Sequence, residues 1–242
     1  MSDRPTLSLV MPAYNEEANI GLVVERVEDV VRRLGLRYEL IVVDDGSVDD
    51  TRVKVNEYVR SNGHAKVIGY DSNLGKGYAL RTGFSHAVGD IVVFMDSDSD
   101  IDPKQVGRYV AALKDADVVI ASKRHPQSKV DIPLIRRILS YWFNALVKLL
   151  VGLRLSDTQA GLKAVRRRAL VGVFSKLAVK RYAFDVELLA LAHLRGLKIV
   201  ELPINIRLRG LFGVREVWRM FLDLLGITYR LRVIRWYQRA MK

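Results

Sequence analysis

Short apolar runs that end in polar clusters are the feature that most constrains the fold of this sequence. Four of them occur in the first hundred residues, at 7–11, 38–43, 66–70 and 91–95. Their length and apolar character are typical of buried strands. Helical spacing follows the first three runs, at 15–34, 49–60 and 76–88. Strands that alternate with helices predict an α/β fold with a mostly parallel central sheet, whose functional loops follow the strand ends.

The second half of the chain is less regular. Residues 117–121 predict another strand, and 133–151 predict a long apolar helix. On that helix a polar stripe recurs every four residues, formed by Arg136, Ser140, Asn144 and Lys148. Its charge-free stretch is shorter than the roughly 18–20 residues of a membrane span. We expect this helix to be buried or to lie in a membrane interface.

The C-terminal residues 211–242 mix aromatic side chains with arginines at helical spacing. This pattern is typical of a helix that lies on anionic lipid, and a final pair of helices packed on the sheet would show it equally. We expect one domain over 1–206, with a first part at 1–102 and a second part at 103–206. A basic amphipathic helical region that faces a membrane is expected to follow at 207–242.

The net charge of +12 is unevenly distributed. Residues 1–128 carry 16 Lys and Arg against 20 Asp and Glu, a net charge of −4, whereas residues 129–242 carry 23 against 7, a net charge of +16. A basic half suits nucleic acid, anionic lipid or a phosphorylated substrate. Its basic residues alternate with large aliphatic residues and match no nucleic-acid-reading motif, so we expect no nucleic-acid partner.

The chain contains no cysteine, which excludes disulfides and thiolate metal sites. Its first residues lack the charged and then apolar pattern of a signal peptide, and we expect a cytoplasmic, peripheral membrane location. Without a predicted span, the chain would reach a membrane through its own helices or through an anchoring partner subunit.

Four polar clusters follow the predicted strands, at 12–16, 44–47, 73–77 and 96–102. A tyrosine ring and carboxylates suit a nucleobase, which can stack on the ring and donate an N–H to the acid. Glycines in the third cluster allow a ligand to approach the backbone, and Lys76 offers a phosphate a positive charge.

The fourth cluster contains two carboxylates, Asp96 and Asp98, one residue apart at the end of a buried strand. Their repulsion would be costly without a cation, and oxygen ligands suit Mg²⁺ or Mn²⁺. Such an ion could bridge the phosphates of a nucleotide sugar and neutralise the departing diphosphate. Asp100 adds a third carboxylate, and we predict all three as metal ligands.

In this order and spacing, the motifs PAYNE, VVDDGSxDxT, NxGKGxAxRxG and FMDSDSD resemble those of family-2 glycosyltransferases. The resemblance implies the GT-A nucleotide-diphospho-sugar transferase fold and direct displacement with inversion at the anomeric carbon. Together the clusters and the resemblance predict a nucleotide-sugar site formed by Pro12, Ala13, Tyr14, Glu16, Asp44, Asp45, Gly75, Lys76, Arg81, Asp96 and Ser97. Dolichyl-phosphate sugar synthases commonly carry Gln where this chain has Asp100.

The second half resembles the dolichyl-phosphate hexosyltransferases. Its motifs DTQAGLK at 157–163 and AFDVELL at 183–189 are more similar to the glucosyl enzymes than to the mannosyl enzymes. The resemblance implies that Arg136 and Ser140 hold the acceptor phosphate, assisted by Lys123 or Arg124, where the family has Gly-Ser-Arg. It also places Asp185 near the floor of the site, with Glu187 a weaker candidate. We predict as catalytic residues Asp96, Asp98, Asp185 and Arg136.

The resemblance thus makes 1–206 the expected GT-A catalytic domain, with a nucleotide-binding part at 1–102 and an acceptor part at 103–206. The expected reaction transfers a hexose to a dolichyl or polyprenyl phosphate at a membrane surface with anionic lipid. UDP-glucose is the favoured donor and GDP-mannose an alternative. An acceptor phosphate is already anionic, so a dedicated general base is not required. Three alternatives remain open at this point: a family-2 enzyme with a non-lipid acceptor, a nucleotidyltransferase on a related fold, and a basic nucleic-acid-binding domain.

Overall fold

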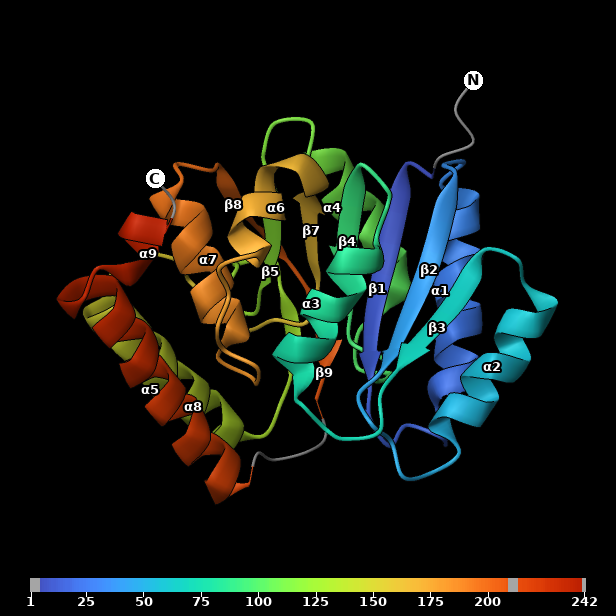
Figure 1. Ribbon diagram of the computed structural model, residues 1–242, viewed down its shortest axis with the longest axis horizontal. Coiled ribbons are helices and arrows are strands. Elements are labelled where there is room, and N and C mark those ends of the chain that lie inside the picture. Colours follow the sequence, from blue (N-terminus) through green and yellow to red (C-terminus); the bar gives the residue numbers. More distant parts are fainter. Residues whose placement is uncertain (1–4, 209–212, 241–242) are drawn as a thin grey trace.

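The computed structural model describes residues 5–208 and 213–240. Its central sheet has seven strands in the order β3-β2-β1-β4-β7-β5-β8 (Figure 1). These strands are β1 (Leu7–Ala13), β2 (Tyr38–Asp44), β3 (Ala65–Gly69), β4 (Ile91–Phe94), β5 (Val118–Ser122), β7 (Lys163–Arg166) and β8 (Ile199–Pro203). β7 is antiparallel to both of its neighbours, and the other pairs are parallel. The predicted α/β architecture with a mostly parallel sheet is therefore confirmed.

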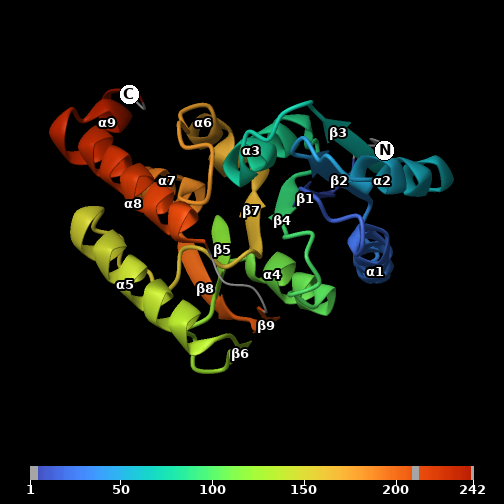
Figure 2. The same cartoon turned by 90° about the horizontal axis from the view of Figure 1, so that it is seen from below.

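Helices cover both faces of the sheet (Figure 2). The α-helices are α1 (Ile20–Arg33), α2 (Thr51–Ser61), α3 (Lys76–His86), α4 (Val106–Ala112), α5 (Leu134–Leu150), α6 (Arg167–Phe174), α7 (Phe184–Leu194), α8 (Val214–Thr228) and α9 (Trp236–Ala240). A 3₁₀ turn, η1 (Pro103–Gln105), precedes α4, and a π-helical turn, η2 (Tyr229–Val233), follows α8. A second, two-stranded parallel sheet joins β6 (Lys129–Asp131) to β9 (Asn205–Arg207).

Alternating side chains of each strand enter two hydrophobic cores. On β2, Ile41 and Val43 face one core with side chains of α3, α6 and α7, whereas Leu40 and Val42 face the other with α1 and α4. This alternation follows from the two-residue period of a strand. Burial on both faces explains why the strand sequences are continuous apolar runs.

The first helix is shorter than predicted. It begins at Ile20 rather than at residue 15, because the side chain and backbone of Asn15 bond to the loop after β2. The Asn15 amide donates to Ser47 Oγ at 3.0 Å, the Val48 amide donates to Asn15 Oδ1 at 3.0 Å, and Asn15 has a positive φ of 54°. Residues 14–19 thus form a turn at the strand end instead of the first helical turn.

Helices α5 and α8 lie side by side at one end of the sheet, apart from the layers that cover it (Figures 1 and 2). They reach the core through a few buried side chains, among them Val147, Leu224 and Ile227. The predicted helix at 133–151 is confirmed as α5. Of the expected C-terminal region 207–242, residues 209–212 and 241–242 lie outside the described part of the chain, as do residues 1–4.

Candidate active site

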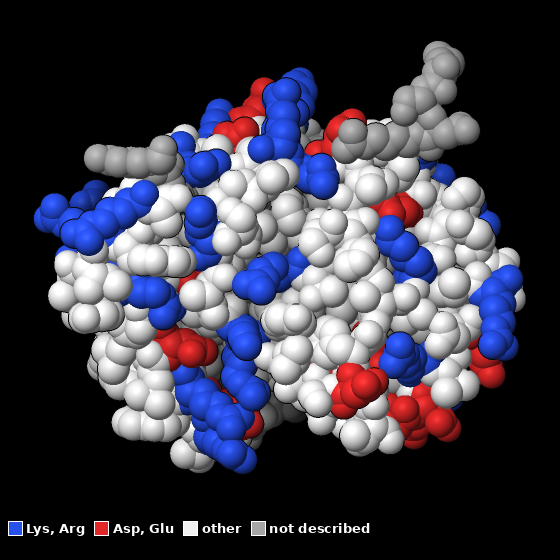
Figure 3. All heavy atoms as spheres, in the orientation of Figure 1, with Lys and Arg blue, Asp and Glu red and all other residues white. Residues whose placement is uncertain are grey.

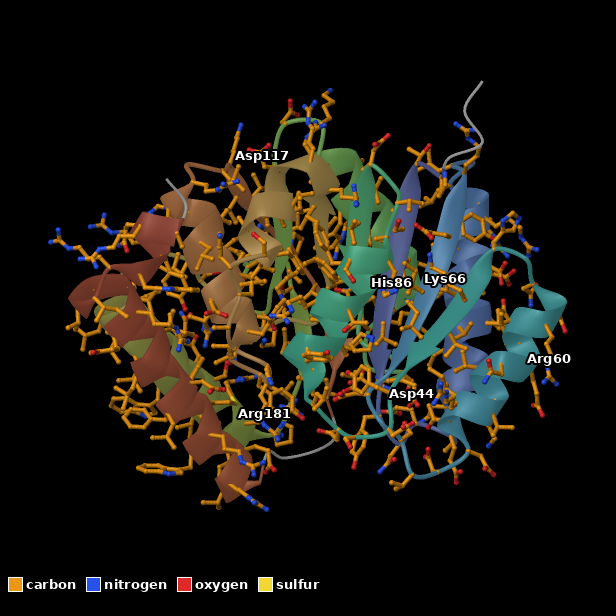
Figure 4. The ribbon with its side chains drawn as sticks, viewed as in Figure 1. Asp44, Arg60, Lys66, His86, Asp117 and Arg181 are labelled. Atoms are coloured by element: carbon orange, nitrogen blue, oxygen red, sulfur yellow. The ribbon has the colours of Figure 1, made fainter. Side chains whose placement is uncertain are left out.

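A cavity of about 370 Å³ opens at the edge where the parallel strands end. Figure 4 shows Asp44 and Arg181 at this lower edge of the sheet. The cavity brings together most of the predicted site residues: Pro12, Ala13, Tyr14, Glu16, Asp45, Gly75, Lys76, Asp96, Ser97, Asp98, Lys123, Arg136, Ser140 and Asp185. Four further predicted residues are not among those that line it: Asp44, Arg81, Asp100 and Arg124.

The turn after β1 presents Tyr14 with 44% of its surface exposed, so its ring is available for stacking on a planar ligand. The neighbouring Glu16 amide donates to Thr51 Oγ1 at 2.8 Å, which fixes the turn against α2. Burial raises the pKa of the Glu16 carboxyl, and the charges of Asp100, Asp49 and Asp96 add to the effect. Glu16 therefore lies close enough to the acidic motif at 96–102 to feel its negative charge.

The two adjacent aspartates after β2 have different surroundings. Asp45 accepts hydrogen bonds from Tyr70 Oη at 2.6 Å and from the Leu74 and Gly75 amides at 2.9 Å each. Asp44 accepts one from the Ser47 amide at 3.2 Å. Asp45 thus holds the glycine loop, residues 73–77, in place at the cavity, whereas Asp44 stabilises its own turn.

The glycine loop leads directly into α3. Gly75 has a φ of +103°, and a Cβ at this position would lie 2.7 Å from the Lys180 carbonyl oxygen, so only glycine fits here. Lys76 then places its Nζ 2.5 Å from Asp96 Oδ1. Burial lowers the pKa of Lys76, but Asp96, Asp185 and Asp98 outweigh burial and hold it above its ordinary value.

Arg81 has a structural role in this arrangement. Its Nη1 donates to the Leu177 carbonyl oxygen at 2.9 Å, and its guanidinium lies 5.6 Å from the centre of the Tyr78 ring. It therefore fastens the loop before α7 to α3.

The acidic motif follows β4 and concentrates negative charge. Burial raises the pKa of Asp98 to about 7, and the charges of Asp96 and Asp100 contribute to this shift. Gly161 lies against the carboxylate of Asp96, because a Cβ there would be 2.0 Å from Asp96 Oδ2. The Asp100 amide donates to Asp98 Oδ1 at 3.3 Å, which ties the two residues into one turn.

This cluster has the chemistry of a divalent-cation site. Within residues 5–208 and 213–240, no three His, Asp or Glu side chains converge closely enough to enclose a metal ion by themselves. Mg²⁺ commonly binds through one or two carboxylates, with substrate phosphates and water completing its coordination. Asp96 and Asp98, both lining the cavity and crowded enough to raise a pKa, fit an ion held in that way.

On the other side of the cavity, the neighbouring residues Lys123 and Arg124 have different contacts. Lys123 lines the cavity, and its Nζ lies 2.7 Å from Asp157 Oδ2. Burial raises the pKa of Asp157, but Lys123 outweighs it and holds that pKa below its ordinary value. Arg124 instead donates to the carbonyl oxygens of Ser156 and Ser140, at 2.7 and 2.6 Å. It joins the loop after β5 to α5.

The polar stripe of α5 faces the protein over most of its length. Arg136 and Ser140 line the cavity, while Asn144 is buried and donates to the Ser156 carbonyl oxygen at 3.0 Å. Burial lowers the pKa of Arg136, and Asp100 and Asp98 act against this shift. Arg136 is therefore close enough to the acidic motif to share its electrostatic field. Lys148, at the end of the stripe, is exposed.

Asp185 and Glu187 at the start of α7 also differ. Asp185 lines the cavity and its Oδ1 lies 3.0 Å from the Nζ of the buried Lys163. Glu187 is fully buried and accepts hydrogen bonds from the Ala178 and Val179 amides at 2.9 and 2.8 Å. Asp185 thus keeps its place in the predicted site, whereas Glu187 holds the backbone beside it.

Sequence reasoning did not assign a site role to Gln159, Gly161 or Arg181, all of which line the cavity. The first two belong to the DTQAGLK motif, and Arg181 stands two residues before the AFDVELL motif. The motifs therefore indicated the segments that reach the cavity. They did not indicate which side chains point into it, because that depends on the loop conformation, which residue spacing does not reveal.

The sequence pattern of glycosyl transferase family 2 matches residues 8–174, more than half of the chain. The chain therefore belongs to glycosyl transferase family 2. Among its relatives, human dolichyl-phosphate beta-glucosyltransferase is 34% identical over 221 residues, which cover 84% of this chain and 68% of the human protein. Dodecaprenyl-phosphate galacturonate synthase of Rhizobium johnstonii is 30% identical over 233 residues, covering 93% and 67%. The chain spans about two thirds of the length of these relatives.

Among solved structures, glucosyl-3-phosphoglycerate synthase of Mycobacterium tuberculosis, crystallised with Mn²⁺, UDP-glucose and phosphoglyceric acid, has a similar fold. The TM-score is 0.68 at 25% identity, over 93% of this chain and 80% of the mycobacterial chain. The predicted GT-A fold is confirmed by this likeness and by the family match.

Proposed function

We propose that the chain is a metal-dependent, inverting glycosyltransferase that moves a hexose from a nucleotide sugar to a dolichyl or polyprenyl phosphate at a membrane surface. One observation carries the proposal. A single cavity joins the nucleotide-sugar motifs and the acidic pair Asp96 and Asp98 to cations on the acceptor side, Lys123 and Arg136. Donor and acceptor phosphates would thus meet in one cavity whose charged side chains are already in position.

UDP-glucose is the proposed donor, with GDP-mannose as the alternative. Support comes from the relatives, one of which is named for transferring glucose to dolichyl phosphate. The mycobacterial enzyme was crystallised with UDP-glucose and Mn²⁺. The galacturonate synthase shows that relatives of similar identity are named for a different sugar, so the base and the sugar both need to be tested.

Asp96 and Asp98 would hold Mg²⁺ or Mn²⁺, with Asp100 beside them. The bound ion would supply charge neutralisation for the departing nucleoside diphosphate. Lys76, already 2.5 Å from Asp96, would contribute a fixed positive charge on the donor side. Asp185, held by Lys163, would form the cavity floor near the sugar.

The acceptor phosphate would itself be the nucleophile. Arg136, Lys123 and the Ser140 hydroxyl line the acceptor side and are placed to bind its oxygens. A phosphate oxygen would attack the anomeric carbon while the bond to the diphosphate breaks, with inversion and without proton removal by the protein. Positioning and charge compensation would then provide most of the rate enhancement.

Apolar side chains exposed on α5 and α8 support a membrane-facing surface. Trp142 is 68% exposed on α5 and Trp218 is 60% exposed on α8. Other exposed apolar residues of the two helices are Leu134, Ile135, Ile138, Leu139, Tyr141, Leu149, Val214, Leu222 and Leu225. In Figure 3, largely uncharged atoms cover the lower left, where these helices lie, with Lys and Arg atoms and a smaller group of Asp or Glu atoms at its margins. Apolar surface edged by cations suits an anionic bilayer.

Among the described residues, none of the helices combines the length and the apolar character needed to cross a bilayer. We therefore propose that this paired face of α5 and α8 rests on the membrane and brings the cavity to its lipid substrate. Because Leu139 and Phe143 of α5 and Val217 and Met220 of α8 line the cavity, the prenyl chain would leave it between these two helices.

The test uses the purified full chain, vesicles that contain a polyprenyl phosphate, and labelled UDP-glucose or GDP-mannose in separate reactions. With Mg²⁺ or Mn²⁺ we expect a β-linked glycosyl phospholipid and free nucleoside diphosphate, and no product with a chelator. Transfer only to a soluble phosphorylated acceptor would identify a non-lipid enzyme instead. No transfer from either donor would contradict the proposal.

The metal assignment has its own variant. Asp98→Asn should reduce transfer by at least about 100-fold, because it removes one of the two carboxylates that face the diphosphate. Asp115→Asn is the matched control, since Asp115 is exposed between α4 and β5 and does not line the cavity. Full activity of Asp98→Asn would refute the assignment.

A further inference from the structure

Arg181 is a cation of the cavity wall that the reaction proposed above does not use. Its side chain lines the cavity, yet within the described part of the chain it forms no ion pair or hydrogen bond. The two lysines of the wall each form an ion pair: Lys76 with Asp96 at 2.5 Å and Lys123 with Asp157 at 2.7 Å. A partly buried guanidinium has five N–H donors, and leaving them without an acceptor is unfavourable.

The backbone that carries Arg181 is held from several sides. Glu187 Oε2 accepts hydrogen bonds from two consecutive amides of this loop, those of Ala178 and Val179. The Tyr78 amide donates to the Lys180 carbonyl oxygen at 3.0 Å, and Arg81 holds the Leu177 carbonyl oxygen. The loop backbone is therefore organised before any ligand binds, so a ligand would have to order only the Arg181 side chain and not the backbone that carries it.

Arg181 lies between the donor loop and the membrane-facing helices. A Cβ on Gly75 would be 2.9 Å from Arg181 Cγ, so the side chain passes over the glycine loop. On its other side is α8: burial raises the pKa of Asp223, and the charges of Arg230 and Arg181 act against that shift. Arg136 approaches the same cavity from α5. A phosphate that enters between α5 and α8 would thus meet a guanidinium on each side.

We propose that Arg181 binds the phosphate of the acceptor, opposite Arg136. The assignment rests on the proposed function and deepens it. Lys76 would serve the donor side through its contact with Asp96, whereas the Arg181 side chain lines the cavity and bonds to no other residue of the described structure. A phosphate monoester carries nearly two negative charges at neutral pH, and two planar guanidinium groups can bind it through paired hydrogen bonds. Lysine would provide the charge without that paired geometry.

The experiment measures transfer from UDP-glucose to a short, water-soluble isoprenyl monophosphate, which separates phosphate binding from membrane docking. Arg181→Gln should raise the KM for this acceptor by about 10- to 100-fold, as expected for a lost charge-assisted hydrogen bond. The KM for UDP-glucose and the calorimetric Kd for UDP should change by less than about twofold. Arg181→Lys should recover only part of the acceptor affinity.

Arg60→Gln is the matched control, because Arg60 is exposed on α2, at the far end of the molecule from Arg181 (Figure 4). Circular dichroism and the thermal midpoint check the fold of each variant, and Arg181→Gln should match the wild type because the side chain makes no bond to the described protein. An equal rise of the acceptor KM in Arg60→Gln would overturn the assignment, since it would show a general charge effect.

Two other results would overturn the assignment alone. One is an unchanged acceptor KM in Arg181→Gln. The other is a weaker Kd for UDP with an unchanged acceptor KM, which would assign Arg181 to the donor diphosphate. If the wild-type chain transferred the sugar neither to the isoprenyl monophosphate nor to the vesicle-bound polyprenyl phosphate, the proposed function would be overturned, and this assignment with it.

Discussion

Gly161 and Asp96 show how closely the backbone of the DTQAGLK motif approaches the acidic motif. A Cβ at Gly161 would lie 2.0 Å from Asp96 Oδ2, far inside van der Waals contact. Asp96 is partly exposed, so its carboxylate has room to rotate away. The glycine therefore matters for the position of a proposed metal ligand more than for the packing of the core.

We predict that Gly161→Ala reduces transfer by at least about tenfold, because the Asp96 carboxylate must leave its place beside Lys76. The free energy of unfolding should fall by only about 1–3 kcal/mol, as for other local steric changes. Kinetics and urea denaturation measure the two effects. Gly21→Ala is the control, since nothing lies within 4 Å of a Cβ there. Wild-type activity of Gly161→Ala would contradict the geometry.

The titration of Asp98 gives a second prediction. Its pKa of about 7 lies above the ordinary value near 3.9, so between about pH 4 and 7 the folded state keeps a proton that the unfolded state loses. In the presence of a chelator, the free energy of unfolding should therefore decrease as the pH rises through this window. Asp98→Asn should remove this part of the decrease, and Asp115→Asn should not.

Urea denaturation at pH 5 and pH 8 measures the difference. Adding Mg²⁺ or Mn²⁺ at pH 8 should stabilise the wild type, because the ion binds the folded state, and should stabilise Asp98→Asn much less. Equal pH dependence in the wild type and Asp98→Asn would show that Asp98 titrates normally.

Residue types at strand ends predicted which positions gather at the cavity, but they did not predict which protein atoms each side chain contacts there. Asp45 and Arg124 are predicted to bind ligands, and the structure shows that both also bond to the protein: Asp45 to Tyr70 and Gly75, and Arg124 to Ser156 and to Ser140 of α5. Which atoms a carboxylate or guanidinium meets depends on loop conformation. Single-sequence patterns carry little information about that conformation.

At the level of elements, the apolar runs predicted the strands well where they were long and buried. β7 was not predicted, because it has only four residues and begins and ends with a charged one. It pairs antiparallel with both β4 and β5, so it joins the two halves of the sheet. Its position brings the preceding Gln159 and Gly161 into the cavity.

The C-terminal elements are fastened to α7 by a buried hydrogen-bond cluster. The Tyr237 hydroxyl of α9 donates to Glu187, and Arg230 Nε of η2 donates to the Tyr237 hydroxyl oxygen at 2.7 Å. The same Glu187 carboxylate holds the loop that carries Arg181. One buried acid thus connects η2 and α9, which follow α8, to the cavity wall.

We predict that Tyr237→Phe lowers the free energy of unfolding by about 1–3 kcal/mol, because buried Glu187 loses a hydrogen-bond donor. The C-terminal segment should also become more sensitive to limited proteolysis, as its attachment to α7 is weakened. Tyr229→Phe is the matched control, since Tyr229 is 54% exposed. Equal stability and cleavage rates for the two variants would contradict the attachment.

For the whole molecule, the acidic and the basic halves of the sequence contribute different parts of the cavity. The acidic N-terminal half supplies the motifs of the proposed donor side, and the basic C-terminal half supplies α5 and α8, which contribute to the cavity lining. Composition alone allowed a nucleic-acid surface, an anionic lipid surface or a phosphorylated ligand. The exposed apolar residues on the same two helices favour lipid, because nucleic-acid surfaces do not require them.

If these helices rest on a bilayer, the double variant Trp142→Ser and Trp218→Ser should bind vesicles with anionic lipid at least about tenfold more weakly, since each indole loses its apolar contact with the membrane. Co-sedimentation measures the affinity, and binding by the wild type should weaken in high salt because the flanking cations are screened. The fold should persist, because both side chains are exposed. Val53→Ser, an exposed site on α2, should bind as the wild type does. Unchanged vesicle binding by the double variant would place the membrane contact elsewhere on the molecule.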